Sequence, residues 1–440
     1  MKLLFISLGC DKNLVDTEHM LAMLTADGIT LTNEEQEADI VVVNSCCFIN
    51  DAMEESIQTL IDMGQLKETG ALKYLIVTGC LAPRSEQEIK TDLHEVDAVV
   101  GTNSYDEIVN TIHHLVAGES GDVTKSLSGL PDNYAGRMLT TGGHFAHLKI
   151  AEGCNKHCTY CVIPSIRGEF RSVPMEQLLA EAEELASQGV QELILVAQET
   201  TLYGVDLYGK KMLPELLNCL SEISGIRWIR LQYCYPEEIT AELIETMASN
   251  PKVCHYIDMP IQHANDWILG RMGRKTSAED IRRKVRALRD AMPDIAIRTT
   301  LICGFPGETP QMHQEMMDFV RDMQFDRLGC FAFSPQEGTP AAEFDYQVDD
   351  NTKEDWVAEI MELQQEISAQ CNERMIGEDI EAFVEGHVTD ENAYVARTYR
   401  DAPDVDGLIF IQTERELMTG DFVKAHIIGS YEYDLIGELL

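Results

Sequence analysis

The chain has 440 residues, 45% hydrophobic and 25% charged, a composition typical of folded globular proteins rather than disordered or collagen-like ones. It carries 75 acidic and 34 basic residues, a formal net charge of −41, so a basic macromolecule suits it better as a partner than a nucleic-acid polyanion. No apolar run reaches the roughly 18 residues of a membrane span, and the length fits about three domains.

The amino terminus predicts a first β-strand rather than a secretory leader. Leu8-Gly9-Cys10 resembles a lipoprotein cleavage site, but the apolar core is about six residues long, too short for a leader. The 13 cysteines are an odd number, and the chain is long enough to bury a core without disulfides. We therefore expect a cytoplasmic protein, in which clustered cysteines act more often as metal ligands or catalytic groups.

Strands and helices alternate through the first part of the chain. Short β-branched runs predict strands at residues 3–8, 39–44, 74–78 and 96–100, with helices between them, as at 13–24 and 50–63. This spacing is typical of βαβ units in a parallel sheet. We assign residues 1–118 to a doubly wound α/β domain. Residues 119–145, with Gly, Ser, Thr and Asp and little periodicity, predict a linker.

A second α/β unit follows the linker. Strands are predicted at residues 148–151, 192–197, 226–232, 256–259, 295–302 and 327–333, with amphipathic helices between them, such as 175–188 and 278–291. Six β/α units over residues 146–372 are typical of an open barrel related to the TIM barrel, whose active site lies at the carboxyl ends of the strands. A long amphipathic helix, residues 353–374, comes next.

The last part of the chain changes pattern. Short alternating runs at residues 379–388, 393–400, 407–413 and 422–430, separated by turn signals, predict a small all-β barrel over residues 373–440.

Three cysteines follow the first strand of the predicted open barrel. Cys154, Cys158 and Cys161 lie within eight residues, in a loop at the active-site face. A structural zinc would require a fourth ligand, for which His157 is the nearby candidate, although its position next to Cys158 strains a tetrahedron. A redox Cys-x-x-Cys pair is a further alternative. The pattern favours a [4Fe-4S] cluster with three thiolates, because such a cluster leaves one iron open for a substrate.

Three more cysteines end strands of the first domain. Cys10, Cys46 and Cys80 each follow an apolar strand and one or two small residues, and they are 36 and 34 residues apart. One such cysteine is more often a buried small hydrophobe, but three at equivalent strand ends can converge at one sheet edge. Cys47 is the alternative to Cys46, and strand alternation points it the opposite way. We assign the other cysteines to packing: Cys219, Cys234, Cys254, Cys303, Cys330 and Cys371.

The Cys-x-x-x-Cys-x-x-Cys loop on a partial barrel resembles the radical SAM superfamily. The resemblance implies that the open iron binds the amino and carboxylate groups of S-adenosylmethionine. An electron from the cluster then cleaves this cofactor to a 5′-deoxyadenosyl radical. It also implies that Tyr160 lies beside the adenine and that an electron donor such as flavodoxin or ferredoxin is needed.

With two cysteine triples and three domains, the whole chain resembles the radical SAM methylthiotransferases. The matching phrases are residues 7–13, 43–46, 78–80, 162–168 and 302–309, together with the cluster loop. Members usually carry Gly where this chain has Cys47. The resemblance implies two [4Fe-4S] clusters, a C-terminal TRAM domain, and a second S-adenosylmethionine as the methyl donor.

The family has one branch that modifies a hypermodified adenosine of tRNA and a RimO-type branch that modifies an aspartate β-carbon of small-subunit ribosomal protein twelve. Residues 198–204, 258–263, 334–339, 400–407 and 431–437 resemble the second branch. Charge is an independent guide, since residues 373–440 hold 16 acidic and 5 basic residues, a net of −11. Such a barrel favours a basic protein over RNA. The basic stretch at residues 271–289 runs against this acidic trend. It is either a solvated helix face or an RNA contact.

The resemblance extends to single residues. Gln198 and Gln262, at the ends of two barrel strands, are expected to bind S-adenosylmethionine, although each could be a strand cap. Gly304 and Gly307 would let the backbone approach closely below the adenine, or serve as turn residues. The loop around Pro403 predicts an exposed acidic contact for the basic substrate, made by Asp401, Asp404 and Asp406.

Overall fold

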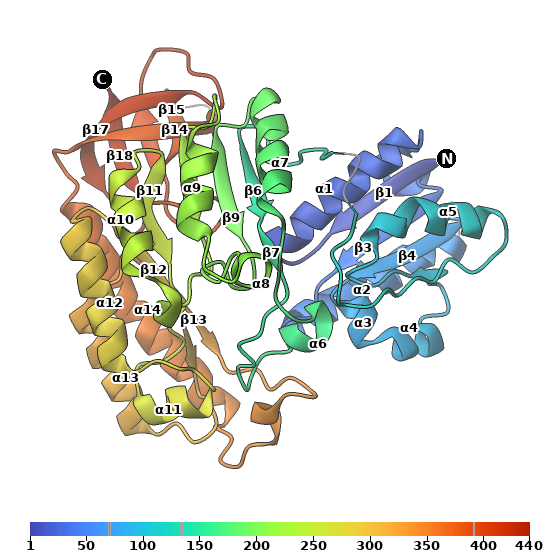
Figure 1. Ribbon diagram of the computed structural model, residues 1–440, viewed down its shortest axis with the longest axis horizontal. Helices are drawn as coiled ribbons and strands as arrows, with labels where there is room; N and C mark the ends of the chain where they lie inside the picture. The colour runs from blue at the N-terminus through green and yellow to red at the C-terminus, as the bar shows by residue number, and fades with distance from the viewer. Residues whose placement is uncertain (69, 71, 133–135, 390–391) are drawn as a thin grey trace.

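Three packed units follow one another along the chain in the computed structural model, which describes residues 1–440 except 69, 71, 133–135 and 390–391. In Figure 1 the first unit lies at the right in blue, the second occupies the centre in green and yellow, and the last stands at the upper left in red. Residues 133–135 of the predicted linker lie outside the described residues. Among the described helices, none combines the length and apolar character that crossing a membrane requires.

The first unit is a doubly wound parallel sheet, as predicted. Its strands pair in parallel in the order β2-β1-β3-β4-β5. One apolar cluster joins α1 and α5 to one face of the sheet, and a second joins α2 to the other face. The two-residue β2 is too short for a sequence pattern to reveal. The elements are β1 Lys2–Ser7, α1 Asp11–Ala26, β2 Thr30–Leu31, β3 Ile40–Ser45, α2 Asn50–Glu68, β4 Tyr74–Gly79, α3 Leu81–Arg84, α4 Glu86–Asp92, β5 Ala98–Val99 and α5 Ile108–Val116.

The central unit is an open sheet of six parallel strands in the order β13-β12-β11-β10-β9-β6, which confirms the six predicted β/α units. Its helices bury apolar faces on the outside of the curved sheet in one large core. Its strands are β6 Phe145–Lys149, β9 Glu192–Val196, β10 Trp228–Leu231, β11 Val253–Asp258, β12 Ala296–Cys303 and β13 Arg327–Ala332, with a small hairpin of β7 Ala151–Glu152 and β8 Arg171–Ser172. Its helices are α6 Ile163–Arg167, α7 Met175–Ser187, α8 Val205–Tyr208, α9 Leu213–Ser221, α10 Ala241–Ser249, α11 Asp266–Arg271, α12 Ala278–Ala291, α13 Pro310–Met323 and α14 Asp350–Glu373.

The last unit is a closed five-stranded barrel in the order β14-β15-β16-β18-β17. Four of its strands were predicted: β14 Asp379–His387, β15 Ala393–Thr398, β16 Ile409–Gln412 and β17 Phe422–Ser430. The fifth, β18 Leu435–Leu439, was missed, and it closes the barrel by pairing in parallel with β16 and antiparallel with β17.

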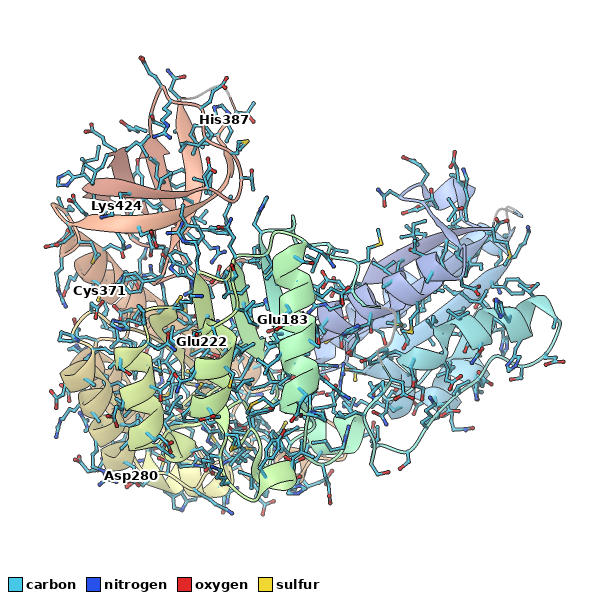
Figure 2. The ribbon with its side chains drawn as sticks, turned by 45° about the horizontal axis from the view of Figure 1, so that its top comes forward. Glu183, Glu222, Asp280, Cys371, His387 and Lys424 are labelled. Atoms are coloured by element: carbon cyan, nitrogen blue, oxygen red, sulfur yellow. The ribbon has the colours of Figure 1, made fainter. Side chains whose placement is uncertain are left out.

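Buried charges fasten this barrel to the amino-terminal edge of the central sheet. Glu192, the first residue of β9, accepts hydrogen bonds at 2.7 Å from Arg230 of β10 and from Arg397 of β15, and all three side chains are buried. In Figure 2, Lys424 on the barrel lies at the upper left and Asp280, at the start of α12, lies at the lower left, with the central unit between them. The barrel therefore docks at the edge opposite to the carboxyl ends of the strands, where the active site is expected.

Replacing Glu192 by Gln is expected to lower the free energy of unfolding by about 3–5 kcal/mol, because two buried arginines lose their shared counter-charge. Urea unfolding followed by intrinsic fluorescence measures this, since Trp228 packs at the same interface, with its ring centroid 4.8 Å from that of Phe422. The control is Arg321→Gln, which breaks an exposed pair with Asp318 and should cost less than about 1 kcal/mol. Equal losses in the two variants would show that the barrel does not depend on Glu192.

Candidate active site

The loop cysteines sit immediately after β7, as predicted. Gly153 starts the loop with φ +77°, and a Cβ there would lie 2.2 Å from the backbone oxygen of Glu169, so only glycine fits. Cys154 and Cys158 are buried and Cys161 is partly buried. Burial raises the pKa of the Cys154 thiol to about 11 and that of Cys161 to about 12. These raised pKa values favour the neutral thiols of Cys154 and Cys161, so their thiolates would need a bound cation to offset the buried charge.

The geometry does not support the zinc alternative. The His157 side chain is exposed, with the residue at φ +49°, instead of turning inward with the thiols. Within the described residues, no three His, Cys, Asp or Glu side chains are arranged to hold a single metal ion. A cubane cluster sets its thiolate ligands farther apart than one zinc ion does. Three inward thiols without a fourth protein ligand fit a [4Fe-4S] cluster with one open iron.

The first-domain cysteines lie at one edge of their sheet. Ser7 of β1 is in register with Asn44 of β3, and Asn44 with Thr78 of β4, so the residues that follow these strands are neighbours. Burial and the nearby Cys10 raise the pKa of the Cys80 thiol to about 12, against the lowering effect of Arg167. Burial and Cys10 also raise the pKa of Cys46. The three thiols are therefore brought together, as strand ends predicted.

Two glycines make room at this edge. Gly9 has φ +89°, and a Cβ there would lie 2.9 Å from the Cys46 sulfur. Gly79 has φ +85°, and its Cβ would lie 2.3 Å from the Asn44 side-chain oxygen. Both backbones adopt the left-handed conformation that favours glycine, so side chains are excluded on the thiol side.

Cys47 differs from the other three cysteines in its contacts. It is fully buried and packs into the apolar cluster between the sheet and α2. Its sulfur donates to the backbone oxygen of Cys80 at 3.1 Å, and burial raises its pKa to about 11. These contacts are those of a packing residue, but Cys80 belongs to the same apolar cluster, so the choice of Cys46 stays a prediction.

One arginine joins the two cysteine triples. Arg167, the last residue of α6, donates to the sulfur of Cys80 at 3.5 Å and to Glu152 at 3.1 Å. Glu152 in turn accepts from the backbone of Gly153, at the start of the cluster loop, at 3.3 Å. Arg167 also donates to Asp16 of α1 at 2.9 Å. The two sites thus share one buried polar network across the domain interface.

Sequence reasoning missed this network. Its first-domain members besides Cys80 are Asn13 and Asp16, buried polar residues on the first turns of α1. Their spacing of three residues places Asn13 and Asp16 on one helix face, a signal that the sequence contained. What the sequence did not contain was the partner, since Arg167 is remote in the chain.

Gln198 has the contacts expected of a ligand-binding residue. Its Nε2 donates to Glu152 at 2.9 Å, but its Oε1 is buried without a hydrogen-bond partner. An orphaned buried oxygen next to the cluster loop fits a bound group with a donor, such as the amino group of S-adenosylmethionine. Gln262 has φ +70°, a strained conformation for a residue with a side chain, held by its backbone hydrogen bond to Thr300.

Tyr160, expected beside the adenine, packs against an apolar cluster that contains Phe305, which follows Gly304 in the chain. Tyr160 packs edge-on against Phe305, with ring centroids 6.5 Å apart, and burial raises its pKa. Gly304 and Gly307 have φ +73° and +88°. Their close neighbours are protein side chains: a Cβ would lie 2.2 Å from Lys353 at Gly304 and 2.7 Å from Trp267 at Gly307.

The expected exposed acidic contact is wrong for two of its three residues. Asp401 is buried and accepts from Arg327 at 2.6 Å, and the Asp406 carboxylate accepts from Tyr256 at 2.7 Å. Burial raises the pKa of Asp406. These carboxylates are drawn inward because arginines and a tyrosine of the central sheet point at the docked barrel. Asp404 alone is exposed, at φ +64°.

The basic stretch divides in two. Arg283 and Arg286 are largely exposed on α12, with side chains 71% and 66% accessible, as a solvated helix face would be. Arg274 is instead buried, with its guanidinium carbon 4.2 Å from the ring centroid of Tyr235. The turn before it packs on the cluster loop, since Thr159 donates from its backbone to Met272 at 3.0 Å.

The cysteines assigned to packing are buried except for Cys219, which is partly exposed. The structure adds one relation that their spacing did not suggest: the sulfurs of Cys303 and Cys330, on neighbouring strands, lie 3.3 Å apart.

Three family models match the chain in order. Residues 2–101 match an uncharacterized protein family, UPF0004, residues 148–320 match the radical SAM superfamily, and residues 376–440 match the TRAM domain. The chain is 54% identical over 437 residues to the ribosomal protein uS12 methylthiotransferase RimO of Lachnoclostridium phytofermentans, covering 99% of both chains. It is 45% identical to the protein of that name from Thermoanaerobacter sp., covering 98% of both.

Solved structures share the fold at low identity. The radical S-adenosylmethionine methyltransferase TsrM of Kitasatospora setae, with cobalamin and a [4Fe-4S] cluster bound, superposes with a TM-score of 0.56 at 13% identity, covering 86% of this chain and 78% of TsrM. The cobalamin-dependent S-adenosylmethionine radical enzyme OxsB gives 0.53 at 13% identity, over 83% and 56% of the two chains.

Proposed function

The chain belongs to the RimO family of ribosomal protein uS12 methylthiotransferases, and from this we propose that it places a methylthio group on the β-carbon of an aspartate of uS12. It is a radical SAM transferase with a TRAM domain. The observation that carries the proposal is the hydrogen-bond network that runs from Cys80 through Arg167 and Glu152 to the start of the loop with the second cysteine triple. A sulfur-transfer site and a radical site must act on the same substrate carbon, so they must lie close together.

The residues present fit two [4Fe-4S] clusters. Cys154, Cys158 and Cys161 would hold one in the loop after β7, and Cys10, Cys46 and Cys80 would hold the other at the edge of the first sheet. When bound, the loop cluster with S-adenosylmethionine supplies a carbon radical able to break a C–H bond, and the first-domain cluster supplies an iron for sulfur. Such a bond is too strong for acid–base chemistry, so the protein's own part is binding and positioning.

The chain's polar residues orient S-adenosylmethionine. Gln198, held by Glu152, offers an unpaired oxygen to its amino group. Gln262 lies on the same rim, fixed in a strained backbone conformation, and we assign it to the same amino-acid end. Tyr160 provides an aromatic edge for the adenine. Gly304 and Gly307 keep their backbone turns at the pocket, with close packing against Lys353 and Trp267.

Anaerobically reconstituted protein is expected to bind about eight irons, because two cysteine triples each hold one four-iron cluster. Replacing Cys154, Cys158 and Cys161 together by Ala should leave about four irons. Iron and sulfide analysis after gel filtration measures both numbers. A wild-type protein that saturates at four irons would contradict the second cluster.

Charge supports a protein substrate over tRNA. Asp401 and Asp406 are buried together with Arg397 and Arg400, so the rest of the segment 373–440 still has a net charge of −11. Such a surface attracts a basic ribosomal protein and repels phosphates. It disfavours the alternative, methylthiolation of a tRNA adenosine. A ribosomal substrate also places the reaction in the cytoplasm.

Reversing three exposed acidic residues of the barrel, Asp404, Glu414 and Glu416, to Lys is expected to slow association with uS12 several-fold at low salt. Charge at an interface rim acts mainly on the encounter rate, by attracting the partner before contact. Stopped-flow measurements at rising salt give the association rate with uS12. The difference in this rate between the variant and the wild type should shrink as screening increases.

The matched control reverses three exposed acidic residues on the outer helices of the central unit, Glu183, Glu222 and Glu245; the first two are labelled in Figure 2. This variant has the same net charge but an unchanged barrel. Equal slowing in both variants would show that overall charge, rather than the barrel, draws the substrate. Tighter wild-type binding to tRNA than to uS12 would overturn the substrate assignment.

The loop cluster requires one electron for each cleavage, and we assign its supply to an acidic carrier such as flavodoxin or ferredoxin. Residues 271–290 hold eight basic and three acidic residues, a net of +5 in a chain of −41. The turn at Met272 contacts the cluster loop, so a carrier bound to this stretch would lie near the cluster.

A further inference from the structure

Arg167 is a buried guanidinium with partners in two domains. Its side chain is 2% exposed. One terminal nitrogen donates to Asp16 of the first unit and Glu152 of the central unit, at 2.9 and 3.1 Å. The other donates to the side chain of Asn13 and to the sulfur of Cys80. A residue that only fastened two domains would have no need of the sulfur contact.

We propose that Arg167 is a positioning residue that sets the reduction potential of the first-domain cluster and ties it to the S-adenosylmethionine site. This inference rests on the proposed function, in which Cys80 is a cluster ligand. An N–H bond to a ligand sulfur draws electron density from the cluster and raises its potential. The potential of a cluster held by the first unit is thus set by a residue of the second.

The charges around Arg167 also predict that its removal lowers the reduction potential of the first-domain cluster. Arg167 and Lys149 face Asp16 and Glu152, two positive charges against two negative, all of them buried. Removing the guanidinium leaves one carboxylate uncompensated beside Cys80. A negative charge disfavours the added electron of a reduced cluster, so it lowers the potential.

The link reaches the cofactor through Glu152. One oxygen of this carboxylate accepts from Arg167, and the other accepts from Gln198 at 2.9 Å. Cys80, Arg167, Glu152 and Gln198 therefore form one chain of hydrogen bonds from the first cluster to the residue assigned to the amino group of S-adenosylmethionine.

A second buried arginine offers a matched control. Arg137, in the segment that joins the two units, donates to Glu181 of α7 at 2.9 Å and to the backbone oxygen of His147 at 2.6 Å, and it pairs with Glu18 of α1. It spans the same two units and its side chain is as well buried, but its hydrogen-bond partners among the described residues are all oxygens. If each arginine only stabilised the interface between the two units, replacing either one should have the same effect.

The test uses the full chain with Cys154, Cys158 and Cys161 replaced by Ala, so that the first cluster is titrated alone. Arg167→Gln, Arg167→Lys and Arg137→Gln are each added to this background and reconstituted anaerobically. Iron analysis checks that about four irons remain. Redox titration followed by electron paramagnetic resonance then gives the potential of the cluster.

Arg167→Gln is expected to shift the potential negative by at least a tenfold change in the reduction equilibrium, or about 59 mV. Arg167→Lys should give a smaller negative shift, because an ammonium keeps the charge but cannot span all four partners. Arg137→Gln should leave the potential unchanged. If Arg167→Gln does not hold iron, the reduction potentials of Arg167→Lys and Arg137→Gln are compared instead. A more negative potential in Arg167→Lys then supports the inference.

Equal potentials in the Arg167 and Arg137 variants, with iron retained, would overturn the inference and leave the cluster assignment intact. A background protein that binds no iron would overturn the cluster assignment itself, and the role of Arg167 with it.

Discussion

Replacing Cys10, Cys46 and Cys80 by Ala is expected to abolish methylthiolation of uS12 while 5′-deoxyadenosine formation continues. The loop cysteines and Gln198 are untouched, and the loop is shaped by Gly153 and by its contact with the turn at Met272. Cys80 of the first domain is linked to that site through Arg167 and Glu152. Chromatography of the nucleoside and mass analysis of the protein measure the two activities in one reaction.

Cys47→Ala is the control for this prediction. Its thiol packs among apolar side chains and donates to a backbone oxygen, so the variant should keep both activities apart from a modest loss of stability. Methylthiolated product from the variant lacking Cys10, Cys46 and Cys80 would show that sulfur is transferred elsewhere. Loss of product in Cys47→Ala alone would show that Cys47, and not Cys46, binds iron.

The sheet edge of the first domain was predictable because its chemistry follows topology. Parallel strands end at one edge, so Cys10, Cys46 and Cys80 had to be neighbours once the strands were recognised. The same reasoning placed the cluster loop at the active-site face. Both predictions needed only short-range patterns and the geometry of parallel sheets.

The buried charge network could not be predicted in the same way. Arg167 meets Asp16 across 151 residues of chain, and Arg397 meets Glu192 across 205. A charged residue looks the same in sequence whether it faces solvent or a partner in another domain. For this reason Asp401 and Asp406, in a loop with Pro403, were expected at the surface, although the arginines that bury them lie on strands of the central sheet.

The fifth barrel strand was missed in the sequence for a related reason. β18 is five residues long and follows β17 after a short turn, so its pattern is too brief to separate from a chain terminus. Its parallel pairing with β16 depends on closure of the whole barrel, which is a property of the fold and not of the segment.

The substrate of the protein is identified most directly by the product that it forms on uS12 and, in a separate reaction, on tRNA. Reconstituted protein is supplied with a low-potential reductant, S-adenosylmethionine carrying a deuterated methyl group, and either uS12 or tRNA with the hypermodified adenosine. We expect tandem mass spectrometry to show one labelled methylthio group on one aspartate of uS12 and none on the tRNA. A labelled methylthio group on the adenosine, with unmodified uS12, would contradict it.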